Sequence, residues 1–404
     1  MRLCFIADGR SPTARSWIEY FATKNHDVHL LSTFPAPPVE GITQHEMRYT
    51  DPKISASRRH WKKSINPTGA LGQTVSYLVE SLVMPRRYFA LRKTVRDLVH
   101  HIRPDLLHAL RIPIEGQLAA YADFHPFVIS VWGNDLTLHA RNFPFHRIKT
   151  RDVMRTVNGL LADANADLIR AKQFGLDARV PTLHIPGGGG VKPDLFFPGP
   201  PRSDIRSRLQ IPQDHQVVIN PRGFRGYVRN DVFLTVIPRV LKVHPLTTFV
   251  CVGLEQWEPA RALAGRPDID RRLVLTESLS QDLLADLYRI AAVSVSPSNH
   301  DGTPNSLLEA MACGCLPLCG DLASIREWIT SGVNGLLFNP NRRDEMFRAI
   351  SLALTDRGLA DRAREVNLDL IAKRAVFESC MSRAEQFYLE LVARSEHEKR
   401  KTSF

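Results

Sequence analysis

The feature that most constrains the fold of this chain is an alternation of short apolar segments with amphipathic ones, which begins close to the first residue. An apolar segment that ends at Asp8-Gly9 is followed by a helical pattern near 13–23. Strands that alternate with helices indicate a mainly parallel sheet with helices on both faces. We expect the basic stretch between the second strand and a helix near 86–102 to be irregular. The strand-like segments of this half are RLCFIA, DVHLLS, DLLHAL, FVISVW, GLLADA and TLHI, and a further helix is predicted near 113–122.

Residues 186–204, PGGGGVKPDLFFPGPPRSD, interrupt this alternation with glycine and proline, which is typical of a connection between domains. The alternation then starts again. With 404 residues, the chain is long enough for two domains of ordinary size. The sequence therefore predicts two doubly wound α/β domains in tandem. The second set comprises strand-like segments at 216–220, 247–253, 272–277, 293–297 and 316–319, with helices near 231–242 and 280–291.

The chain carries a surplus of positive charge, with a formal net charge of +11 and a pI near 9.5. Such a surplus favours anionic partners, among them nucleotides, anionic lipid head groups and nucleic acid. The sequence contains no nucleic-acid-binding motif, so we expect no nucleic-acid partner. It also lacks an apolar run of 18 or more residues and a signal-peptide pattern, so we expect a cytoplasmic protein without a membrane span.

The six cysteines are expected to be reduced thiols rather than metal ligands. Cys4 and Cys251 lie inside apolar strand-like segments, where a free cysteine behaves as a small core residue. Cys313, Cys315 and Cys319 form a C-x-C-x3-C pattern, which lacks the C-x2-C pair or nearby histidine of a zinc site. We therefore predict no metal site.

Two carboxylates, Asp301 and Glu309, stand eight positions apart after the strand-like segment at 293–297. The intervening Ser306-Leu307-Leu308-Glu309 matches a capping box, which predicts a helix that starts near Ser306. Glu309 is then either a helix cap or a ligand-binding group. Ligands of a parallel sheet bind at this edge. The backbone amides in the first turn of a helix suit a phosphate, and carboxylates accept hydrogen bonds from hydroxyl groups. We therefore interpret both carboxylates as hydroxyl acceptors rather than as a glycosidase acid/base pair.

The motif Asp301-x7-Glu309, in SPSNHDGTPNSLLEAMACGCLP, resembles the E-x7-E signature of retaining glycosyltransferases of the GT-B fold, family 4, with Asp in the first position. The flanking LADLYRIAAVSVSPS and SIREWITSGVNGLLFNP also resemble that family, as do DLLHAL, SVWGNDL and LHIPGGGGVKPDLFFPG in the first half. The resemblance implies a GT-B architecture, with two Rossmann-like doubly wound domains that face each other across a cleft. It places an acceptor-binding domain at 1–200, a nucleotide-sugar-binding domain at 201–375, and at 376–404 a helix that packs back toward the first domain, followed by a charged tail.

The resemblance assigns roles to individual residues of the second domain. Glu309 would hold the ribose of a nucleotide sugar, and Asp301 would contact the hydroxyls of the donor sugar, with a reach one methylene shorter than that of Glu. Arg222 matches an arginine that binds the diphosphate, whereas Tyr227 stands where the family has a lysine. A second cation would then be supplied by Arg225 or Arg229. The remaining donor contacts would come from Gly302, Thr303, Pro304 and Asn305 near the sugar, and from Ser306 and Leu307 at the phosphates.

In the first domain, Gly9 matches a glycine that lets the backbone approach the donor phosphates, although an ordinary tight turn explains it equally well. Trp132 stands where many family members have a histidine. Asp135, His108 and Arg15 are then the candidates for acidic, basic or orienting roles. His108 ends an apolar strand, where a core histidine is the alternative.

The implied reaction is retaining transfer of a sugar from a UDP- or GDP-linked donor to a hydroxyl of a glycan or a lipid-linked acceptor, in the synthesis of a cell-surface polysaccharide or glycolipid. Asp301, Glu309, Arg222 and Asp135 would form the catalytic set, the leaving phosphate would accept the proton of the acceptor, and neither a metal nor another cofactor would be needed. A nucleotide-sugar epimerase or hydrolase and a non-catalytic nucleotide-sugar-binding protein are the alternatives.

Two segments combine basic and aromatic residues: KISASRRHWKK at 53–63 and RRYFALRK at 86–93. Such a surface suits an enzyme that binds peripherally to the inner face of an anionic membrane. A solvated basic face of an ordinary helix is the alternative.

Overall fold

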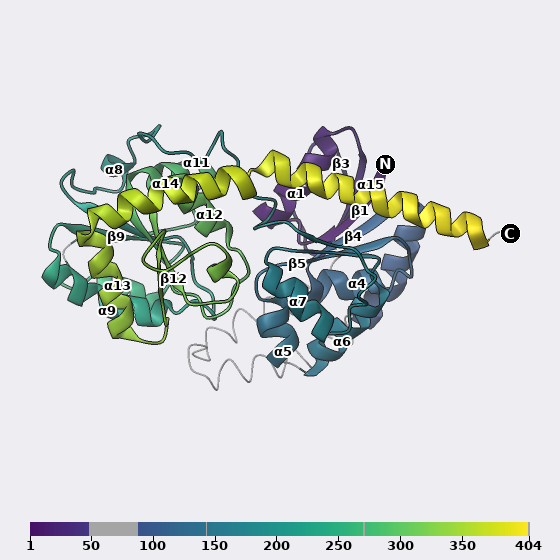
Figure 1. Cartoon of the computed structure of the whole chain (residues 1–404), viewed down its shortest axis with the longest axis horizontal. Helices are drawn as coiled ribbons and strands as arrows, with labels where there is room; N and C mark the ends of the chain where they lie inside the picture. Colours follow the sequence, from purple (N-terminus) through teal and green to yellow (C-terminus); the bar gives the residue numbers. More distant parts are fainter. Residues whose placement is uncertain (48–87, 143, 270, 403–404) are drawn as a thin grey trace. The chain divides into compact units, whose positions relative to one another are not determined.

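The computed structural model describes residues 1–47, 88–142, 144–269 and 271–402. The chain folds into two compact units, one formed by Met1–Gly189 together with Met381–Phe404 and the other by Gly190–Cys380. The first change of unit falls within the glycine- and proline-rich stretch at 186–204. Each unit contains a parallel sheet with helices packed around it, so the fold is α/β (Figure 1).

The sheet of the N-terminal unit has seven parallel strands within the described residues, in the order β3-β2-β1-β4-β5-β6-β7. The inner strand β1 pairs on both sides, so that Leu3 lies opposite Val28 in β2 and Leu106 in β4. Continuous burial of the inner strands explains why they are apolar throughout instead of alternating. The strands are β1 (Arg2–Ala7), β2 (Asp27–Ser32), β3 (Ile42–Glu46), β4 (Leu106–Leu110), β5 (Phe127–Val131), β6 (Gly159–Ala162) and β7 (Thr182–His184).

Helices cover the N-terminal sheet, and the last helix of the chain is one of them. The aromatic rings of Phe21 in α1 and Tyr388 in α15 stack with their centroids 4.9 Å apart. Figure 1 shows α15 running along the unit beside α1. The helices are α1 (Pro12–Thr23), residues 88–102, α4 (Gln117–Ala120), α5 (Ala140–Asn142), α6 (Pro144–Thr156), α7 (Asn165–Gln173) and α15 (Phe377–Thr402), with π-helical turns at Ile112–Gly116 and Asp135–His139.

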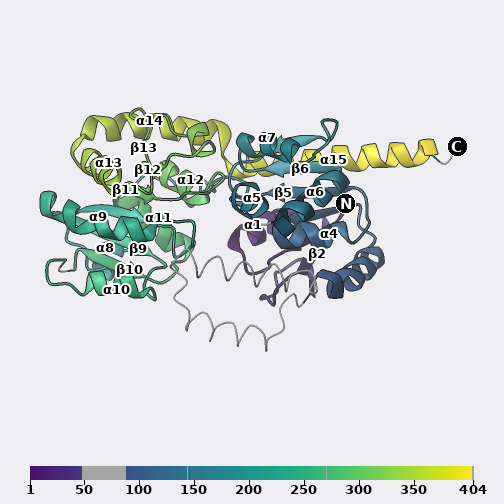
Figure 2. The same cartoon turned by 90° about the horizontal axis from the view of Figure 1, so that it is seen from below.

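The sheet of the C-terminal unit has six parallel strands in the described part of the chain, in the order β10-β9-β8-β11-β12-β13. Figure 2 labels five of them, β10, β9, β11, β12 and β13, in this order from bottom to top. The strands are β8 (Gln216–Asn220), β9 (Thr247–Val252), β10 (Leu273–Thr276), β11 (Ala291–Ser296), β12 (Leu316–Gly320) and β13 (Leu336–Phe338). The helices are α8 (Ile205–Arg208), α9 (Asn230–Val243), α10 (Glu258–Ala264), α11 (Gln281–Ile290), α12 (Asn305–Ala312), α13 (Arg343–Thr355) and α14 (Arg357–Arg374).

Two sequence expectations about the secondary structure of the N-terminal unit are wrong. The stretch after β2 was expected to be irregular, but Ile42–Glu46 forms strand β3 in register with β2. This edge strand is half exposed and polar, so its sequence has no hydrophobic pattern that predicts a strand. The backbone hydrogen bonds to β2 define it instead. The helix expected near 113–122 is a π-helical turn at Ile112–Gly116 that leads into the four-residue helix α4.

The six cysteines are all buried and free, as the apolar surroundings of Cys4 and Cys251 predict. Burial raises the pKa of the Cys313 and Cys319 thiols to about 12, so both stay protonated near neutral pH. Among the described residues, no helix combines the length and apolarity that crossing a bilayer requires.

The basic segment at 53–63 lies outside the described residues. Of the second such segment, Phe89 is 71% exposed, and its neighbours Arg92 and Lys93 are exposed as well. The membrane-binding surface stays a prediction.

Each sheet has one point at which the strand order reverses. In the N-terminal unit this switch point lies between β1 and β4, and in the C-terminal unit between β8 and β11. Ligands of open parallel sheets bind outside the carboxyl ends of the strands at such a point, because the following loops diverge there. The loops that follow β1, β4, β8 and β11 are therefore the positions at which to look for a site.

Candidate active site

An arginine and an aspartate meet at the switch point of the C-terminal sheet. Arg222 follows β8, and its Nη2 donates a hydrogen bond to Oδ2 of Asp301, which follows β11, at 2.6 Å. Its Nη1 donates to Oγ of Ser306 in α12 at 3.2 Å. One guanidinium thus connects both loops of the switch point with the first turn of a helix.

Burial makes this ion pair sensitive to its surroundings. The side chains of Arg222 and Asp301 are 11% and 8% exposed. Burial raises the pKa of Asp301, which the charge of Arg222 opposes in part. Nε of Arg222 is buried and has no hydrogen-bond partner within the described residues. The guanidinium therefore retains a donor that an anionic ligand can use.

Helix α12 begins at Asn305, with Pro304 as its N-cap and without a hydrogen bond from a capping side chain. The capping box predicted from Ser306 and Glu309 is therefore wrong. Pro304 is extended, with φ −68° and ψ 135°, and it ends the loop so that Ser306 already lies inside the first turn. The amide end of α12 carries a partial positive charge and is thus available to an anion.

Glu309 lies one turn further along α12. Its side chain is half-buried, and no residue of the described chain forms a hydrogen bond with it. Burial raises the pKa of Glu309 to about 7, against the lowering effect of Arg222. A carboxylate that loses part of its hydration without gaining a hydrogen bond from the protein costs stability. Glu309 is therefore able to accept hydrogen bonds from hydroxyl groups of a ligand.

Three residues far away in the sequence hold the loop between Asp301 and Ser306 in place. Ser324 Oγ donates to the carbonyl of Asp301 at 2.7 Å, and Trp328 Nε1 donates to Oγ1 of Thr303 at 3.1 Å. The Tyr288 hydroxyl donates to the carbonyl of Ser306 at 3.3 Å. Gly302, Thr303 and Pro304 are buried in this loop. Sequence reasoning missed these supports because no local pattern links them to the motif.

The two candidates for a second cation differ in their surroundings. The guanidinium of Arg229 binds both carboxylate oxygens of Asp231, at 2.9 and 2.8 Å, and also contacts Asn341. Arg225 is exposed, and in the part of the chain that the structure describes its side chain forms no hydrogen bond or ion pair, although its charge lowers the pKa of Asp301. Arg225 is therefore the one that can turn to a ligand without breaking an ion pair.

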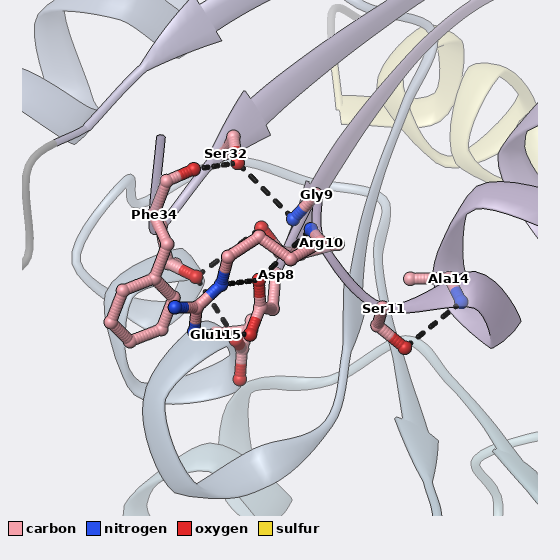
Figure 3. Close-up of polar contacts among 10 residues, drawn as sticks. Asp8, Gly9, Arg10, Ser11, Ala14, Ser32, Phe34 and Glu115 are labelled. Atoms are coloured by element: carbon pink, nitrogen blue, oxygen red, sulfur yellow. Dashed lines mark hydrogen bonds and ion pairs between the residues drawn. The ribbon is translucent and has the colours of Figure 1, made fainter. Parts of the chain in front are cut away.

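Gly9 lies in the first loop of the N-terminal unit, where it packs tightly (Figure 3). Its N–H donates to Oγ of Ser32 at 3.1 Å. A Cβ atom at this position would lie 2.6 Å from that oxygen and 2.9 Å from Cβ of Ala36. Close packing against the end of β2 therefore suffices to require glycine here. Nearby, Arg15 donates to the carbonyl of Pro37 at 2.9 Å.

Asp135 is fully buried and accepts four hydrogen bonds. Arg111 donates through Nε at 3.0 Å and Nη2 at 2.5 Å, and the backbone amides of Ile112 and Trp132 donate at 3.1 and 3.4 Å. This carboxylate thereby fastens the loop after β4 to the loop after β5. In this arrangement Asp135 positions other groups.

His108 is a core histidine. It is fully buried, its Nε2 lies 2.9 Å from Oγ of Ser130, and its Nδ1 contacts the hydroxyl of Tyr388. Burial lowers its pKa to about 3, so the ring is neutral. Trp132 packs edge-on against Trp17 with their centroids 6.2 Å apart, and its side chain is partly exposed.

The predicted residues thus form two groups. Arg222, Asp301 and Ser306 are in contact, and Glu309 lies near Arg222 in the same unit. Gly9 and Asp135 belong to the N-terminal unit. Among the described residues, no three His, Cys, Asp or Glu side chains are arranged to hold a metal ion.

Two family models match the chain and together span most of it. "Glycosyl transferase 4-like" matches residues 2–169 and "Glycosyl transferases group 1" matches residues 223–356, which includes the whole cluster except Arg222. The chain belongs to the group 1, family-4-like glycosyltransferases. The resemblance drawn from the sequence motifs is therefore confirmed.

Relatives of this group 1 glycosyltransferase match it over part of their length. The D-inositol 3-phosphate glycosyltransferase of Geodermatophilus obscurus is 29% identical over 196 residues, which are 46% of this chain and 43% of the relative. The serotype-specific mannosyltransferase WbdA of Escherichia coli is 33% identical over 135 residues, 33% of this chain and 16% of the relative. The chain thus covers less than half of these proteins.

Solved structures share its fold over nearly the whole chain. The sucrose-phosphate synthase of Thermosynechococcus elongatus has a TM-score of 0.76 at 14% identity, covering 98% of this chain and 100% of its own. HepE of Anabaena, in complex with UDP and glucose, has a TM-score of 0.71 at 16% identity, covering 96% of this chain and 99% of its own. The predicted two-domain GT-B fold is therefore confirmed.

Proposed function

We propose that this protein is a retaining glycosyltransferase that moves a sugar from a UDP- or GDP-linked donor to a hydroxyl group of a glycan or lipid-linked acceptor. The observation that carries the proposal is the cluster of Arg222, Asp301 and Ser306 at the β8–β11 switch point, with Glu309 beside it. The cluster combines the Nε of Arg222, unpaired among the described residues, and the amide end of α12 with the carboxylates of Asp301 and Glu309, which are the kinds of group that a nucleoside diphosphate sugar needs.

Each group has a role that suits its surroundings. Glu309 accepts hydrogen bonds from the ribose hydroxyls, since its carboxylate has no partner in the described chain. Nε of Arg222, the exposed Arg225 and the amide end of α12 bind the diphosphate. Asp301, fixed by Arg222 and by the bond from Ser324 to its carbonyl, accepts from the donor-sugar hydroxyls.

The reaction needs charge stabilisation more than a protein acid or base. As the bond between the sugar and the phosphate breaks, negative charge develops on the leaving diphosphate, and the preorganised cations and amides stabilise it. The leaving phosphate then accepts the proton of the attacking hydroxyl from the same face, which preserves the configuration. No metal is assigned to this step. The mannosyltransferase among the relatives supports transfer of a sugar, and HepE, whose fold is shared, was crystallised with UDP and glucose.

The test is nucleotide binding and transfer by a Glu309→Ala variant. Calorimetry with UDP and with GDP identifies the base, and a donor screen by mass spectrometry detects the transferred sugar. Because hydrogen bonds to a charged group contribute about 1.5–3 kcal/mol, we expect the variant to bind the preferred nucleotide at least tenfold more weakly and to lose transfer. Glu365→Ala, an exposed change on α14, is the control that should behave as the parent protein. Unchanged affinity and rate in Glu309→Ala would remove Glu309 from the site.

A further inference from the structure

A buried glutamate that the proposed reaction does not use lies at the other switch point. Glu115 belongs to the π-helical turn after β4, and Figure 3 shows it beside the loop that carries Asp8, Gly9 and Arg10. The residue is 5% exposed, and Oγ1 of Thr33 donates a hydrogen bond to it at 3.3 Å. Neither its position in the sequence nor a motif singles it out.

Burial raises the pKa of Glu115 to about 7, and the charges around it act in both directions. Arg111 lowers this pKa, whereas Asp135 and Asp8 raise it. The side chain lies in the turn after β4, beside Asp8 of the loop that follows β1 (Figure 3). The carboxyl group is therefore close to the edge where a parallel sheet binds its ligand.

The arginines of this edge are already paired. Arg10 binds both carboxylate oxygens of Asp8, at 2.9 and 2.8 Å, and its guanidinium lies over the ring of Phe34. Arg111 is held by Asp135, and Arg15 by backbone carbonyls. Among the described residues that surround Glu115, each cation thus has a carboxylate or carbonyl partner.

We propose that this edge of the N-terminal unit binds an uncharged sugar unit of the acceptor, with Glu115 as the group that forms a hydrogen bond with one of its hydroxyls. The inference rests on the proposed function and specifies its acceptor. A carboxyl group binds a hydroxyl in either protonation state, as acceptor when ionised and as donor when protonated. Within the residues that the structure describes, a phosphate at the same place would face Asp8 and Glu115 without an unpaired cation, which disfavours a phosphorylated acceptor.

Trp132 adds a second feature that suits a neutral sugar. Trp132 follows β5, and its backbone amide donates to the Asp135 carboxylate, as does the amide of Ile112. Its partly exposed ring packs against the ring of Trp17. The apolar face of a sugar ring packs well on a rigid aromatic side chain. This edge therefore offers a hydrogen-bonding carboxyl group and an aromatic surface, and the described part of it offers no phosphate-binding cluster.

The experiment compares neutral and phosphorylated acceptors with the full chain and the donor found in the binding screen. The probes are the methyl glycosides of glucose, mannose and galactose and the corresponding hexose 6-phosphates. We expect kcat/KM for the best neutral glycoside to exceed that for every 6-phosphate by at least tenfold. Saturation-transfer NMR with the UDP-bound protein gives a second readout that does not depend on turnover.

The variant is Glu115→Gln, which keeps the bond from Thr33 but cannot ionise. We expect a KM for the neutral glycoside about tenfold higher than in the parent protein, and an unchanged Kd for UDP. Glu115→Asp should restore part of the KM. Glu390→Gln, an exposed change on α15, is the matched control.

Either of two kinetic results would overturn the inference while UDP still binds: a preference for a 6-phosphate, or an unaltered KM in Glu115→Gln. The absence of an NMR signal from every neutral glycoside would also overturn it. Failure to bind UDP or GDP would instead count against the proposed function itself, so the two failures are distinguishable.

Discussion

At the scale of single residues, the C-terminal cluster contains polar groups that, among the described residues, have no hydrogen-bond partner without a ligand, which lowers the stability of the unliganded protein. Glu309 is half-buried without a hydrogen-bond partner in the described chain, and Arg222 keeps a buried Nε without one. Such groups destabilise the unliganded fold and gain their partners when a ligand arrives. The same groups that lower stability can therefore supply affinity.

Glu309→Gln tests this relation through pH. Burial raises the pKa of Glu309 from 4.5 to about 7, so the folded state favours the protonated carboxyl group. The contribution of this protonation to the free energy of unfolding is fully present below pH 4.5 and is lost as the pH rises through 7. The variant should therefore gain stability over the parent protein between pH 5 and 8, by at most about 3 kcal/mol. Thermal unfolding at fixed intervals of pH measures it. Glu115 is present in both proteins, so its own titration cancels in the comparison. A difference in stability between variant and parent that does not change with pH would contradict the prediction.

At the scale of elements, helix α15 is fastened to the N-terminal sheet by a buried chain of hydrogen bonds. Trp17 Nε1 donates to the hydroxyl of Tyr388 at 3.1 Å. That hydroxyl must then donate its own proton to Nδ1 of His108, because an indole N–H cannot accept. The proton of His108 is thus on Nε2, from which it reaches Ser130. Gly159 completes the contact, since a Cβ there would lie 2.6 Å from Leu391.

Tyr388→Phe should therefore destabilise the protein by about 1–3 kcal/mol, because it leaves buried atoms of Trp17 and His108 without partners. Urea unfolding followed by tryptophan fluorescence measures the change. Tyr121→Phe, at a half-buried tyrosine without such a network, is the control. Equal midpoints for both variants would show that the hydrogen-bond chain contributes nothing.

The sequence predicted those elements whose signal is local. Apolar runs such as QVVIN and DVHLLS match strands β8 and β2 to the residue, because their burial dictates their composition. The edge strand β3 escaped notice because its polar residues are held by pairing with β2. The capping box failed because Pro304 competes for the cap position.

Within the site, the residue types of the motif were recognisable, but their partners were not. Arg222 contacts Asp301 across 79 positions of sequence, and Trp328 supports Thr303 across 25. Glu115 lies in a short apolar stretch that predicts a helix and gives no sign of a site. Contacts of this kind depend on strand order, which hydrophobic patterning does not specify.

At the scale of the whole molecule, the two units have separate hydrophobic cores. One core lies within residues 1–189, and two further clusters lie within 190–380. Because the proposed nucleotide site belongs to one unit, ligand binding should stabilise that unit directly, by about 2.7 kcal/mol at a hundredfold excess over Kd.

Hydrogen exchange under moderate urea measures this effect. UDP should slow exchange in β8 and β11, whereas β1 and β4 should keep their rates. GDP, or whichever nucleotide fails to bind in calorimetry, serves as the control. Equal slowing in all four strands would mean that the units unfold as one.

The path of the chain through the two units has a consequence for biosynthesis. Residues 381–404 complete the N-terminal unit, yet the ribosome makes them after the whole of the C-terminal unit. Until then Trp17 and His108 lack the hydroxyl of Tyr388. The N-terminal unit is therefore translated first but completed last. Until α15 has been made, the surface that it covers in the folded protein is accessible to chaperones.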